Sequence, residues 1–278
     1  MNGKGDKWRG GWTTEYADNF DSIFNKEKRM KKRVFIFDVD GTLTPSRIKM
    51  KKEFKEFFLK WAKGKKYYLV SGSNIEKMDE QVPEEIMMNA KGLFCCGGNE
   101  MWEFDPHIVN FPYNRIYNRK FIPPIQLMTY LGELIRFSET PVQASNHRED
   151  RGSMLNFSVV GRDCTLEERK KYFEWDNQVE ERKGIAKYIE KQWPELEAVI
   201  GGQISIDIAP KGRNKSQVLK HIIEKESDSS EFIFLGDRIE EGGNDYPLAK
   251  LMGKTNGCRY YKVEDYNETK EILESLND

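Results

Sequence analysis

The sequence predicts an α/β fold in which a Rossmann-type core with a parallel sheet carries an inserted α+β domain. Three mostly apolar runs, which begin at Val34, Tyr67 and Glu231, have the length of strands, and each stops at polar or acidic residues, as buried strands of parallel sheets do. Helical patterns separate these runs, which is the alternation expected of such a sheet. Between about residues 112 and 210 strands and helices are mixed without that rhythm, so this block is predicted to be the inserted domain.

The first part of the predicted core covers residues 33–111. Its first strand, residues 34–37, is followed by a helix over residues 49–63, whose apolar residues recur at helical spacing with lysines on the opposite face. Those apolar residues are Met50, Phe54, Phe57, Phe58 and Trp61. A second strand, a polar helix, a short strand and a hairpin are expected at residues 67–74, 75–81, 93–96 and 101–104.

The predicted inserted domain, residues 112–210, contains a long charged helix that starts at a capping box. Thr165 and Glu168 form this box, because their side chains can satisfy the free backbone amides at a helix N-terminus. The helix is expected to run from residue 165 to about residue 193. Another helix and two strands are expected at residues 124–137, 154–160 and 197–209.

The rest of the predicted core, residues 211–278, returns to regular alternation. One helical face carries the apolar side chains of Val218, Leu219, Ile222 and Ile223. A helix is expected at residues 215–225 and a strand at 231–236. An acidic loop that leads into a helix follows at 236–250, then a strand at 258–263 and a final helix at 265–276.

Residues 1–32 are glycine-rich and charged, a composition that predicts a flexible leader. Aromatic side chains are scattered through it, at Trp8, Trp12, Tyr16, Phe20 and Phe24. The alternative is that these aromatic side chains dock on the body of the protein or on a partner. The sequence does not separate the two interpretations.

Charge and composition exclude several classes of protein. The 278 residues carry a formal net charge of -1, so no overall positive field draws the chain to nucleic acid or acidic membranes. Four cysteines without CxxC spacing and three histidines argue against a zinc site and suit a reducing compartment. No apolar run approaches the roughly 18 residues of a membrane span, and residues 1–30 lack the apolar region of a signal peptide. We therefore expect a cytoplasmic protein with no nucleic-acid or membrane partner.

Polar side chains follow the three main strands at the point where each strand ends. Asp38 and Asp40 follow the first strand, Ser71 and Ser73 follow the second, and Asp237 follows the third. Because the carboxyl ends of parallel strands meet at one edge of a sheet, we expect these side chains to lie together. Carboxylates from separate strands favour Mg²⁺, a hard cation with oxygen ligands, and the hydroxyls and amides of residues 71–73 suit a phosphate.

This arrangement suits phosphoryl transfer. With Mg²⁺ bound, one aspartate of the pair can attack a phosphoryl group and form an aspartyl-phosphate. The second carboxylate, two residues away, is placed to give and take the proton of the sugar or alcohol oxygen. Lys215 precedes the third strand and would hold the nucleophile and the phosphate as a point charge. The alternative, an acidic turn without a function, is disfavoured by the glycine and threonines that follow the pair.

Four blocks of the sequence carry a resemblance to a known family. They read DVDGTLTPSR, RGSMLNFSVVGRDCTLEER, GGQISIDIAPKG and GDRIEEGGNDYPL. In order and spacing they resemble the eukaryotic-type phosphomannomutase family of the haloacid dehalogenase-like superfamily, which has a type IIB cap. The similarity spans about residues 33–270. It implies that residues 33–111 and 211–278 form a haloacid dehalogenase-like core and that residues 112–210 form a cap domain.

The resemblance implies a role for each residue of the reacting centre. Asp38 would be the nucleophile, and Asp40 would be the acid/base. Mg²⁺ would be bound by Asp38, the backbone carbonyl of Asp40 and Asp237, while Asp245 supports the metal loop. Lys215 matches the lysine of the family's catalytic set.

The resemblance also implies a set of substrate-binding residues. These are an arginine after the nucleophile, cap arginines that bind the distal phosphate and the sugar, and a Ser–Asp pair that reads phosphate and sugar hydroxyls. The matching residues are Arg47, Arg151, Arg162, Arg169, Ser205 and Asp207, to which the strand-end argument adds Ser73. Ser205 and Asp207 are two apart on an expected strand and therefore share a face.

The implied activity is the interconversion of mannose 6-phosphate and mannose 1-phosphate, which feeds GDP-mannose synthesis. It would proceed through an aspartyl-phosphate and a hexose 1,6-bisphosphate, which is also the activator. The implied partners are a phosphorylated hexose and a second copy of the chain, in a homodimer through the cap. One alternative is a Mg-dependent phosphatase for sugar phosphates or nucleotides, because Ser71 supplies the hydroxyl typical of ordinary phosphatases of the superfamily. A non-catalytic binding module is the other, and the intact aspartates argue against it.

Overall fold

The computed structural model describes residues 32–46, 48–227 and 231–276. The described residues from Arg33 onward form one compact unit. Residues 1–31 of the leader predicted over residues 1–32, and the predicted substrate contact at Arg47, therefore lie outside the described residues. None of the helices in the described part has the length and apolar character that crossing a membrane requires.

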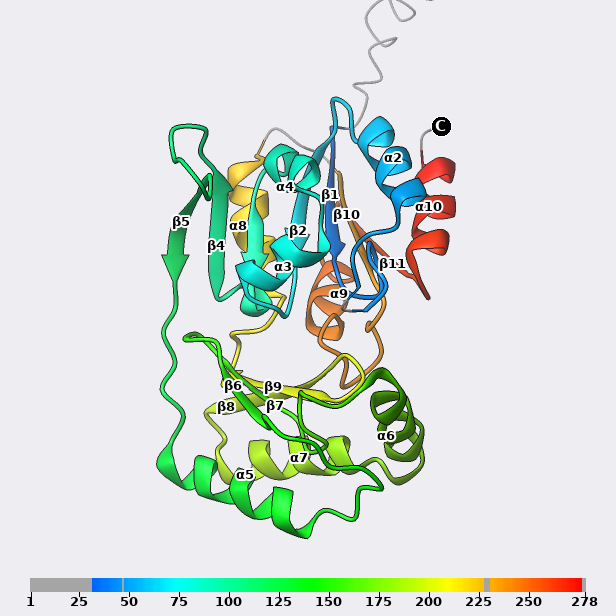
Figure 1. Cartoon of the computed structure of the whole chain (residues 1–278). Helices are drawn as coiled ribbons and strands as arrows, with labels where there is room; N and C mark the ends of the chain where they lie inside the picture. Colours follow the sequence, from blue (N-terminus) through cyan, green and yellow to red (C-terminus); the bar gives the residue numbers. More distant parts are fainter. Residues whose placement is uncertain (1–31, 47, 228–230, 277–278) are drawn as a thin grey trace, which may run out of the picture. The chain divides into compact units, whose positions relative to one another are not determined.

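A seven-stranded sheet organises the part of the described chain that we call the core (Figure 1). Its order is β11-β10-β1-β2-β3-β4-β5, in which β11 to β3 pair in parallel and β4 and β5 are added as antiparallel partners. The strands are β1 (Arg33–Asp38), β2 (Lys66–Val70), β3 (Leu93–Cys95), β4 (Glu100–Phe104), β5 (Tyr113–Asn118), β10 (Glu231–Gly236) and β11 (Cys258–Lys262). The parallel part confirms the predicted α/β class and brings the carboxyl ends of β1, β2 and β10 to one edge.

Helices cover both faces of the core sheet, because the side chains of a buried strand alternate in direction. In β1, Phe35 and Phe37 share the cluster of one face, where Phe37 lies 5.4 Å from Phe58 between ring centroids. Val34 and Ile36 belong to the cluster of the other face. The first face holds α2 (Lys52–Trp61), α3 (Ile75–Gln81), α4 (Glu84–Asn89) and α10 (Tyr266–Ser275), and the second holds α8 (Gln217–Lys225) and α9 (Tyr246–Met252).

A four-stranded antiparallel sheet in the order β6-β7-β9-β8, with three helices, forms the part that we call the cap (Figure 1). The strands are β6 (Arg148–Asp150), β7 (Leu155–Phe157), β8 (Leu196–Gly201) and β9 (Ser205–Pro210), and the helices are α5 (Ile125–Phe137), α6 (Leu166–Val179) and α7 (Glu181–Gln192). All three helices contribute side chains to one apolar cluster with the sheet. This cluster is separate from the two clusters of the core.

Strand alternation gives the cap sheet one apolar and one polar face. Ile206 and Ile208 of β9 are buried in the cluster with the helices. Ser205 and Asp207 of the same strand, and Asn156 of β7, fall on the opposite face and line a cavity. The prediction that Ser205 and Asp207 share a face is confirmed.

Two elements predicted for the cap are divided in the structure. The helix expected over residues 165–193 ends at Val179 and a second begins at Glu181, because Glu180 takes a left-handed conformation with φ of 54°. The strand expected over residues 197–209 is a hairpin of β8 and β9, with Gly202 at φ of 54° in its turn. Both single-element predictions are wrong: a left-handed residue interrupts the helix at Glu180, and the strand reverses at Gly201 and Gly202, a glycine pair that is typical of a hairpin turn.

Two observations test predictions about the cap: how α6 begins, and to which sheet β5 belongs. The capping box is present: the Thr165 hydroxyl accepts from the Glu168 amide, and the Glu168 carboxylate accepts from the Thr165 amide. Strand β5 pairs with β4 of the core, although it lies past residue 112, where the cap is predicted to begin. The division of the chain into a core and an inserted cap otherwise stays a prediction.

Candidate active site

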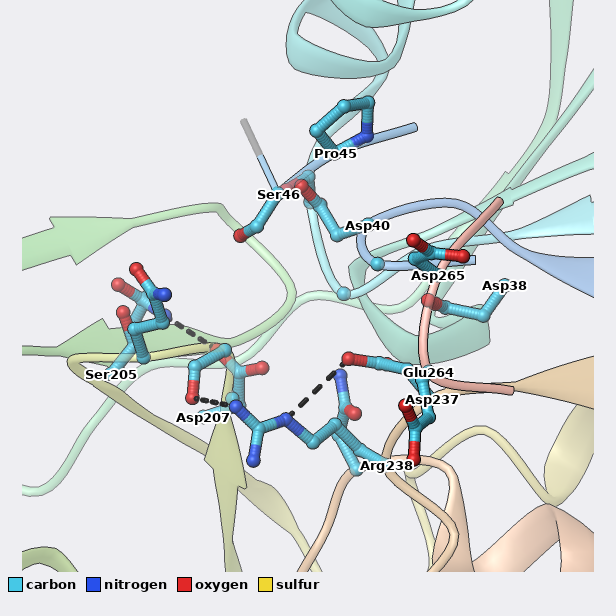
Figure 2. A pocket seen from close by; sticks show the side chains of 18 of the residues that line it. Asp38, Asp40, Pro45, Ser46, Ser205, Asp207, Asp237, Arg238, Glu264 and Asp265 are labelled. Atoms are coloured by element: carbon cyan, nitrogen blue, oxygen red, sulfur yellow. Dashed lines mark hydrogen bonds and ion pairs between the residues drawn. The ribbon is translucent and has the colours of Figure 1, made fainter. Parts of the chain in front are cut away.

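A cavity of about 310 Å³ lies where the carboxyl ends of the core strands meet the polar face of the cap sheet (Figure 2). Predicted site residues reach it from both sides. They are Asp38, Asp40, Ser73, Arg151, Ser205, Asp207 and Asp237. The sheet edge therefore brings the strand-end residues together, as the parallel topology predicts.

Asp38, the predicted nucleophile, is held by a buried lysine. Lys215 Nζ pairs with Asp38 Oδ1 and lies 2.6 Å from Asp245 Oδ1. On the other side, Thr42 Oγ1 donates to Asp38 Oδ2 at 3.4 Å. Burial would lower the pKa of Lys215, but Asp245 and Asp38 outweigh it and raise that pKa. Lys215 is thus a permanent positive charge beside the predicted nucleophile.

Three carboxylates crowd the core side of the cavity. Asp38, Asp237 and Asp245 each offer one oxygen, and these oxygens lie within 4.8 Å of one another. Burial, reinforced by Asp245, raises the pKa of Asp237 to about 7 and raises the pKa of Asp38 well above its usual range. Lys215 contacts Asp38 and Asp245, and Arg238 Nε lies 3.5 Å from Asp237 Oδ2, so three carboxylates face two positive charges. The donor set and the remaining negative charge fit a divalent cation.

Asp245 has both of its carboxylate oxygens engaged by the protein. Oδ1 accepts from Lys215 Nζ, and Oδ2 accepts from the backbone amide of Arg238 at 3.0 Å. Gly236 makes room for this carboxylate, since a Cβ at that position would lie 2.7 Å from Asp245 Oδ2. Asp245 therefore ties the loop after β10 to the lysine, an arrangement compatible with its predicted part as a support of the metal loop.

Asp40, the predicted acid/base, lies on the turn after β1. Its Oδ1 accepts a hydrogen bond from Gln81 Nε2 of α3 at 2.9 Å. The turn can approach Asp237 closely because Gly41 has φ of +85° and no side chain, and a Cβ there would lie 2.5 Å from Asp237 Oδ2. The cluster of three carboxylates found among the described residues does not include Asp40. Its predicted metal contact would be made by the backbone carbonyl.

The loop after β2 presents Ser73 to the cavity and keeps Ser71 inside. Ser73 lines the cavity, whereas Ser71 is buried and its Oγ accepts from the Ser73 amide at 2.9 Å. Asn74 then caps α3 by accepting from the Lys77 amide. The Ser71 hydroxyl, which favours the phosphatase alternative, is therefore engaged in shaping the turn.

On the cap side, Asp207 is joined to two neighbours. Asn156 Nδ2 donates to Asp207 Oδ1 at 2.6 Å, and Arg151 Nη1 lies 3.6 Å from the same oxygen. Arg151 Nη1 also donates to the carbonyl of Gly72, in the core loop after β2. A Cβ on Gly72 would lie 3.1 Å from Asp207 Oδ2. Arg151 and Asp207 of the cap therefore contact the core directly at the edge of the cavity.

The other two predicted cap arginines lie next to the cavity. Arg162 Nη1 donates to Asn156 Oδ1, so Arg162 reaches the cavity lining through that amide. Arg169 lines a neighbouring cavity of about 550 Å³, and both cavities are lined by Ser46 and Gln203. The structure thus gathers both arginines at this side of the cap, while Arg47 lies outside the described residues.

Several lining residues were not predicted: Asn156, Gln203, Arg238, Glu264 and Asp265. Arg238 lies beside Asp237 in Figure 2, and its Nη2 donates to the carbonyl of Gly202 in the cap at 3.3 Å. A basic residue directly after a strand-end aspartate is a local signal that could have identified Arg238 as a candidate site residue. Glu264 and Asp265 offer no such signal, because only the order of the strands brings the loop after β11 to this edge.

Comparison with known proteins agrees with the resemblance of the motifs. A sequence model of the family described as eukaryotic phosphomannomutase matches residues 54–276. The phosphomannomutase of Drosophila melanogaster is 34% identical over 256 residues, which are 87% of this chain and 94% of that protein. The phosphomannomutase of Encephalitozoon cuniculi is 34% identical over 227 residues, which are 79% of this chain and 85% of that protein.

A likeness among solved structures concerns the fold alone. The structure of an IMP-bound mutant of the IMP-nucleotidase from Plasmodium falciparum aligns with a TM-score of 0.59 at 13% sequence identity. The alignment covers 95% of this chain and 77% of that one. At this low identity the match supports the α/β architecture and carries no argument about the substrate.

Proposed function

The chain belongs to the eukaryotic phosphomannomutase family and is an enzyme of that kind, and from this premise we propose that it interconverts mannose 6-phosphate and mannose 1-phosphate. The observation that carries the proposal is the two-sided cavity (Figure 2). Its core side holds Asp38, Asp40 and a carboxylate cluster, and its cap side holds Arg151 with Ser205 and Asp207. A hexose that exchanges phosphate between two of its ends needs one side for the reacting phosphate and another for the rest of the molecule.

The core side performs the phosphoryl transfer. A carboxylate oxygen of Asp38 forms a bond to phosphorus while the bond between phosphorus and the sugar oxygen breaks. Asp40, held by Gln81, gives its proton to the departing sugar oxygen and takes a proton from the hydroxyl that attacks in the reverse step. Lys215 and Thr42 keep the Asp38 carboxylate in place throughout.

We propose Mg²⁺ as the divalent cation of this side. Asp38, Asp237 and the backbone carbonyl of Asp40 would hold it, with Asp245 as support. When bound, it supplies the positive charge that lets an anionic carboxylate approach an anionic phosphoryl group. Without a cation, Lys215 beside Asp38 and Asp245 and Arg238 beside Asp237 oppose the three carboxylates of the cluster.

The mutase cycle needs a priming phosphate. A hexose 1,6-bisphosphate leaves one phosphoryl group on Asp38, and this group is then passed to the free hydroxyl of a hexose monophosphate. The bisphosphate formed in this way turns round inside the cavity and returns its other phosphoryl group to Asp38. Residues of the cap hold the end that is not reacting: the arginines bind its phosphate and the Ser–Asp pair binds hydroxyls, at Arg151, Arg162, Arg169, Ser205 and Asp207, with Arg47 and Ser73 from the core.

The test supplies mannose 1-phosphate, Mg²⁺ and a trace of hexose 1,6-bisphosphate, and follows mannose 6-phosphate and inorganic phosphate. We expect isomer with little phosphate release, and a loss of about 10³-fold or more in Asp38→Asn, which removes the nucleophile. Phosphate release without isomer would show the alternative activity, a sugar-phosphate or nucleotide phosphatase. Equal inactivity of the wild type and Asp38→Asn would support a non-catalytic binding module.

The proposed assembly rests on the family resemblance, and the proposed location rests on the composition of the chain. We propose a homodimer through the cap and a cytoplasmic enzyme that feeds GDP-mannose synthesis. Sedimentation of the full chain tests the assembly, and a single species of monomer mass at micromolar concentration would contradict it.

A further inference from the structure

Glu149 of β6 joins three cationic side chains that come from both sides of the cavity. One oxygen, Oε1, pairs with Lys77 of the core helix α3. The other, Oε2, lies 2.8 Å from Arg151 Nη2, 3.1 Å from Arg151 Nε and 2.8 Å from Arg162 Nη2. A single carboxylate therefore contacts two of the predicted phosphate-binding arginines and one lysine of the core.

The contacts of Glu149 continue into the cavity. Arg162 donates to Asn156, and Asn156 donates to Asp207. Arg151 donates to the carbonyl of Gly72 and lies near Asp207. These links form an unbroken polar path from the half-buried Lys77 of α3 to Asn156 and Asp207 in the lining of the cavity.

The burial of these groups makes their geometry dependent on Glu149. The side chains of Arg151 and Arg162 are 4% and 10% exposed, so water contributes little to holding either guanidinium. A guanidinium fork paired with a carboxylate along two N–H bonds has a fixed orientation. Burial opposes the charge of Glu149, but Arg151, Lys77 and Arg162 outweigh it and lower the pKa of Glu149 to about 2. Glu149 is therefore an anion at every pH at which the enzyme would work.

Lys77 is the only one of the four charged groups that belongs to the core. It stands in the first turns of α3, the helix that also supplies Gln81 to Asp40. Figure 1 shows α3 at the end of the core that faces the cap. The pair of Lys77 and Glu149 thus links the helix that supports the predicted acid/base to the arginines of the cap.

We propose that Lys77 and Glu149 are positioning residues that couple closure of the cap to the orientation of Arg151 and Arg162. Glu149 aligns the two guanidinium groups for the distal phosphate, and Lys77 holds the aligned set against the core. This inference rests on the proposed function, because a hexose bisphosphate that turns round must stay enclosed between its two half-reactions. We call the pair of Lys77 and Glu149 the latch. Weakening the latch would let the bisphosphate intermediate escape and let water reach the phosphorylated Asp38.

The first test measures closure without any substrate. The amide of Ile200 in β8 donates to the carbonyl of Gly242 in the core at 3.0 Å, so its hydrogen exchange reports separation of the cap from the core. We expect Lys77→Met in the full chain to speed this exchange about fivefold, the lower end of usual coupling effects, and Lys77→Arg to restore it. Lys55→Met is the matched control. The side chain of Lys55 is 31% exposed, as is that of Lys77, but Lys55 pairs with Glu85, which belongs to the core and not to the cap.

The second test separates the latch from the alignment of the arginines. Glu149→Gln should speed the exchange at Ile200 as Lys77→Met does, and should also bind inorganic phosphate at least about fivefold more weakly than Lys77→Met. Removal of the negative charge of Glu149 should by simple electrostatics strengthen the binding of phosphate. Weaker binding is therefore expected only if Glu149 orients the guanidinium groups of Arg151 and Arg162. Phosphate binding by Glu149→Gln that equals or exceeds that of Lys77→Met would overturn the alignment role.

The third test follows the reaction. In Lys77→Met we expect the ratio of inorganic phosphate released to isomer formed to rise about fivefold over wild type and over Lys55→Met. Unchanged exchange at Ile200 together with an unchanged ratio would overturn the latch. A wild type that forms no isomer contradicts the proposed function instead, and the exchange measurement then still decides whether the latch exists.

Discussion

At the scale of single residues, the candidate site depends on how each carboxylate of the cluster is balanced by a positive charge or a hydrogen-bond donor. Lys215 separates Asp38 from Asp245, and the backbone amide of Arg238 satisfies the second oxygen of Asp245. Asp237 has Arg238 Nε at 3.5 Å and is the member of the cluster that Gly41 approaches. The close spacing of these groups is therefore made by small residues and by one buried lysine.

Replacement of Gly41 by alanine should reduce activity more than stability. The residue has φ of +85°, which costs an L-residue about 1–2 kcal/mol, and a Cβ there would push on Asp237 Oδ2 from 2.5 Å. We expect an activity loss of at least about tenfold, because misplaced groups of about 1 Å have effects of that order or larger.

Gly64→Ala is the control for that loss. Gly64 has φ of +74°, but nothing lies within 4 Å of a Cβ built on it. It should show a similar fall in the free energy of unfolding with normal turnover. Equal activity of the two alanine variants would show that the approach of Gly41 to Asp237 has no importance for the reaction.

Glu149 should make the stability of the protein depend on acid pH. Its pKa is about 2 in the folded chain and about 4.3 in a free peptide. The stabilisation is therefore complete above about pH 5 and is lost as the pH falls toward 2. After a discount for solvent screening we expect roughly 2 kcal/mol at neutral pH. Urea unfolding of wild type and Glu149→Gln should differ by this amount at pH 6 and by clearly less at pH 3, and a constant difference would contradict the argument.

At the scale of secondary-structure elements, alternation along one strand separates packing from function. In β9, Ile206 and Ile208 face the helices of the cap, while Ser205 and Asp207 face the cavity. In β1, the apolar side chains on both faces are buried, so chemistry is left to the last residue of the strand, Asp38, and to the turn that follows it. The cap strand thus carries its functional residues along its length, and the core strand carries them at its end.

The break between α6 and α7 gives a prediction about backbone strain. Glu180 has φ of 54° at the junction, where glycine is the favoured residue. Glu180→Gly should raise the free energy of unfolding by about 0.5–1 kcal/mol, because the left-handed conformation costs glycine nothing. The substitution also removes an exposed ion pair with Lys183, so Lys183→Met serves as the control. Destabilisation by Glu180→Gly beyond that of Lys183→Met, measured by chemical unfolding, would refute the strain.

At the scale of the whole molecule, the site needs the core and the cap together. The carboxylates come from strand ends far apart in sequence, and the guanidinium group of Arg151 comes from the turn that follows β6 of the cap. Direct contacts across the cavity include Arg151 with Gly72 and Lys77 with Glu149. Ligands that bind both sides should therefore stabilise the closed arrangement.

Mg²⁺ should stabilise the folded chain through the carboxylate cluster. It relieves the repulsion among Asp38, Asp237 and Asp245, and a ligand at about 100 times its dissociation constant adds roughly 2.7 kcal/mol. We expect a rise of several degrees in the Tm of the wild type, checked by differential scanning calorimetry with and without EDTA. Asp237→Asn should lose most of the rise. A rise of the same size in this variant would place the cation elsewhere.

Local patterns accounted for much of the fold and for part of the site. The apolar positions of α2 are buried as helical spacing predicts, with Phe54, Phe58 and Trp61 in the core. Asp38, Asp40, Ser73 and Asp237 meet at one edge, because parallel strands leave no other arrangement. Asn156 and Glu264 were not predicted, since each is an ordinary polar residue until the sheet order and the cap bring it to the cavity.

By itself, the sequence determined the α/β class, the carboxylate pair at the carboxyl end of β1 and the family of the chain, because periodicity and motif spacing are local properties. Only the tertiary structure decided that the predicted helix 165–193 is two helices, that the strand 197–209 is a hairpin, and which side chains share the cavity. It also showed that Glu149, a plain surface charge in the sequence, contacts Lys77, Arg151 and Arg162. Contacts between residues distant in the chain depend on how sheets are ordered and faced, and no local pattern records that order.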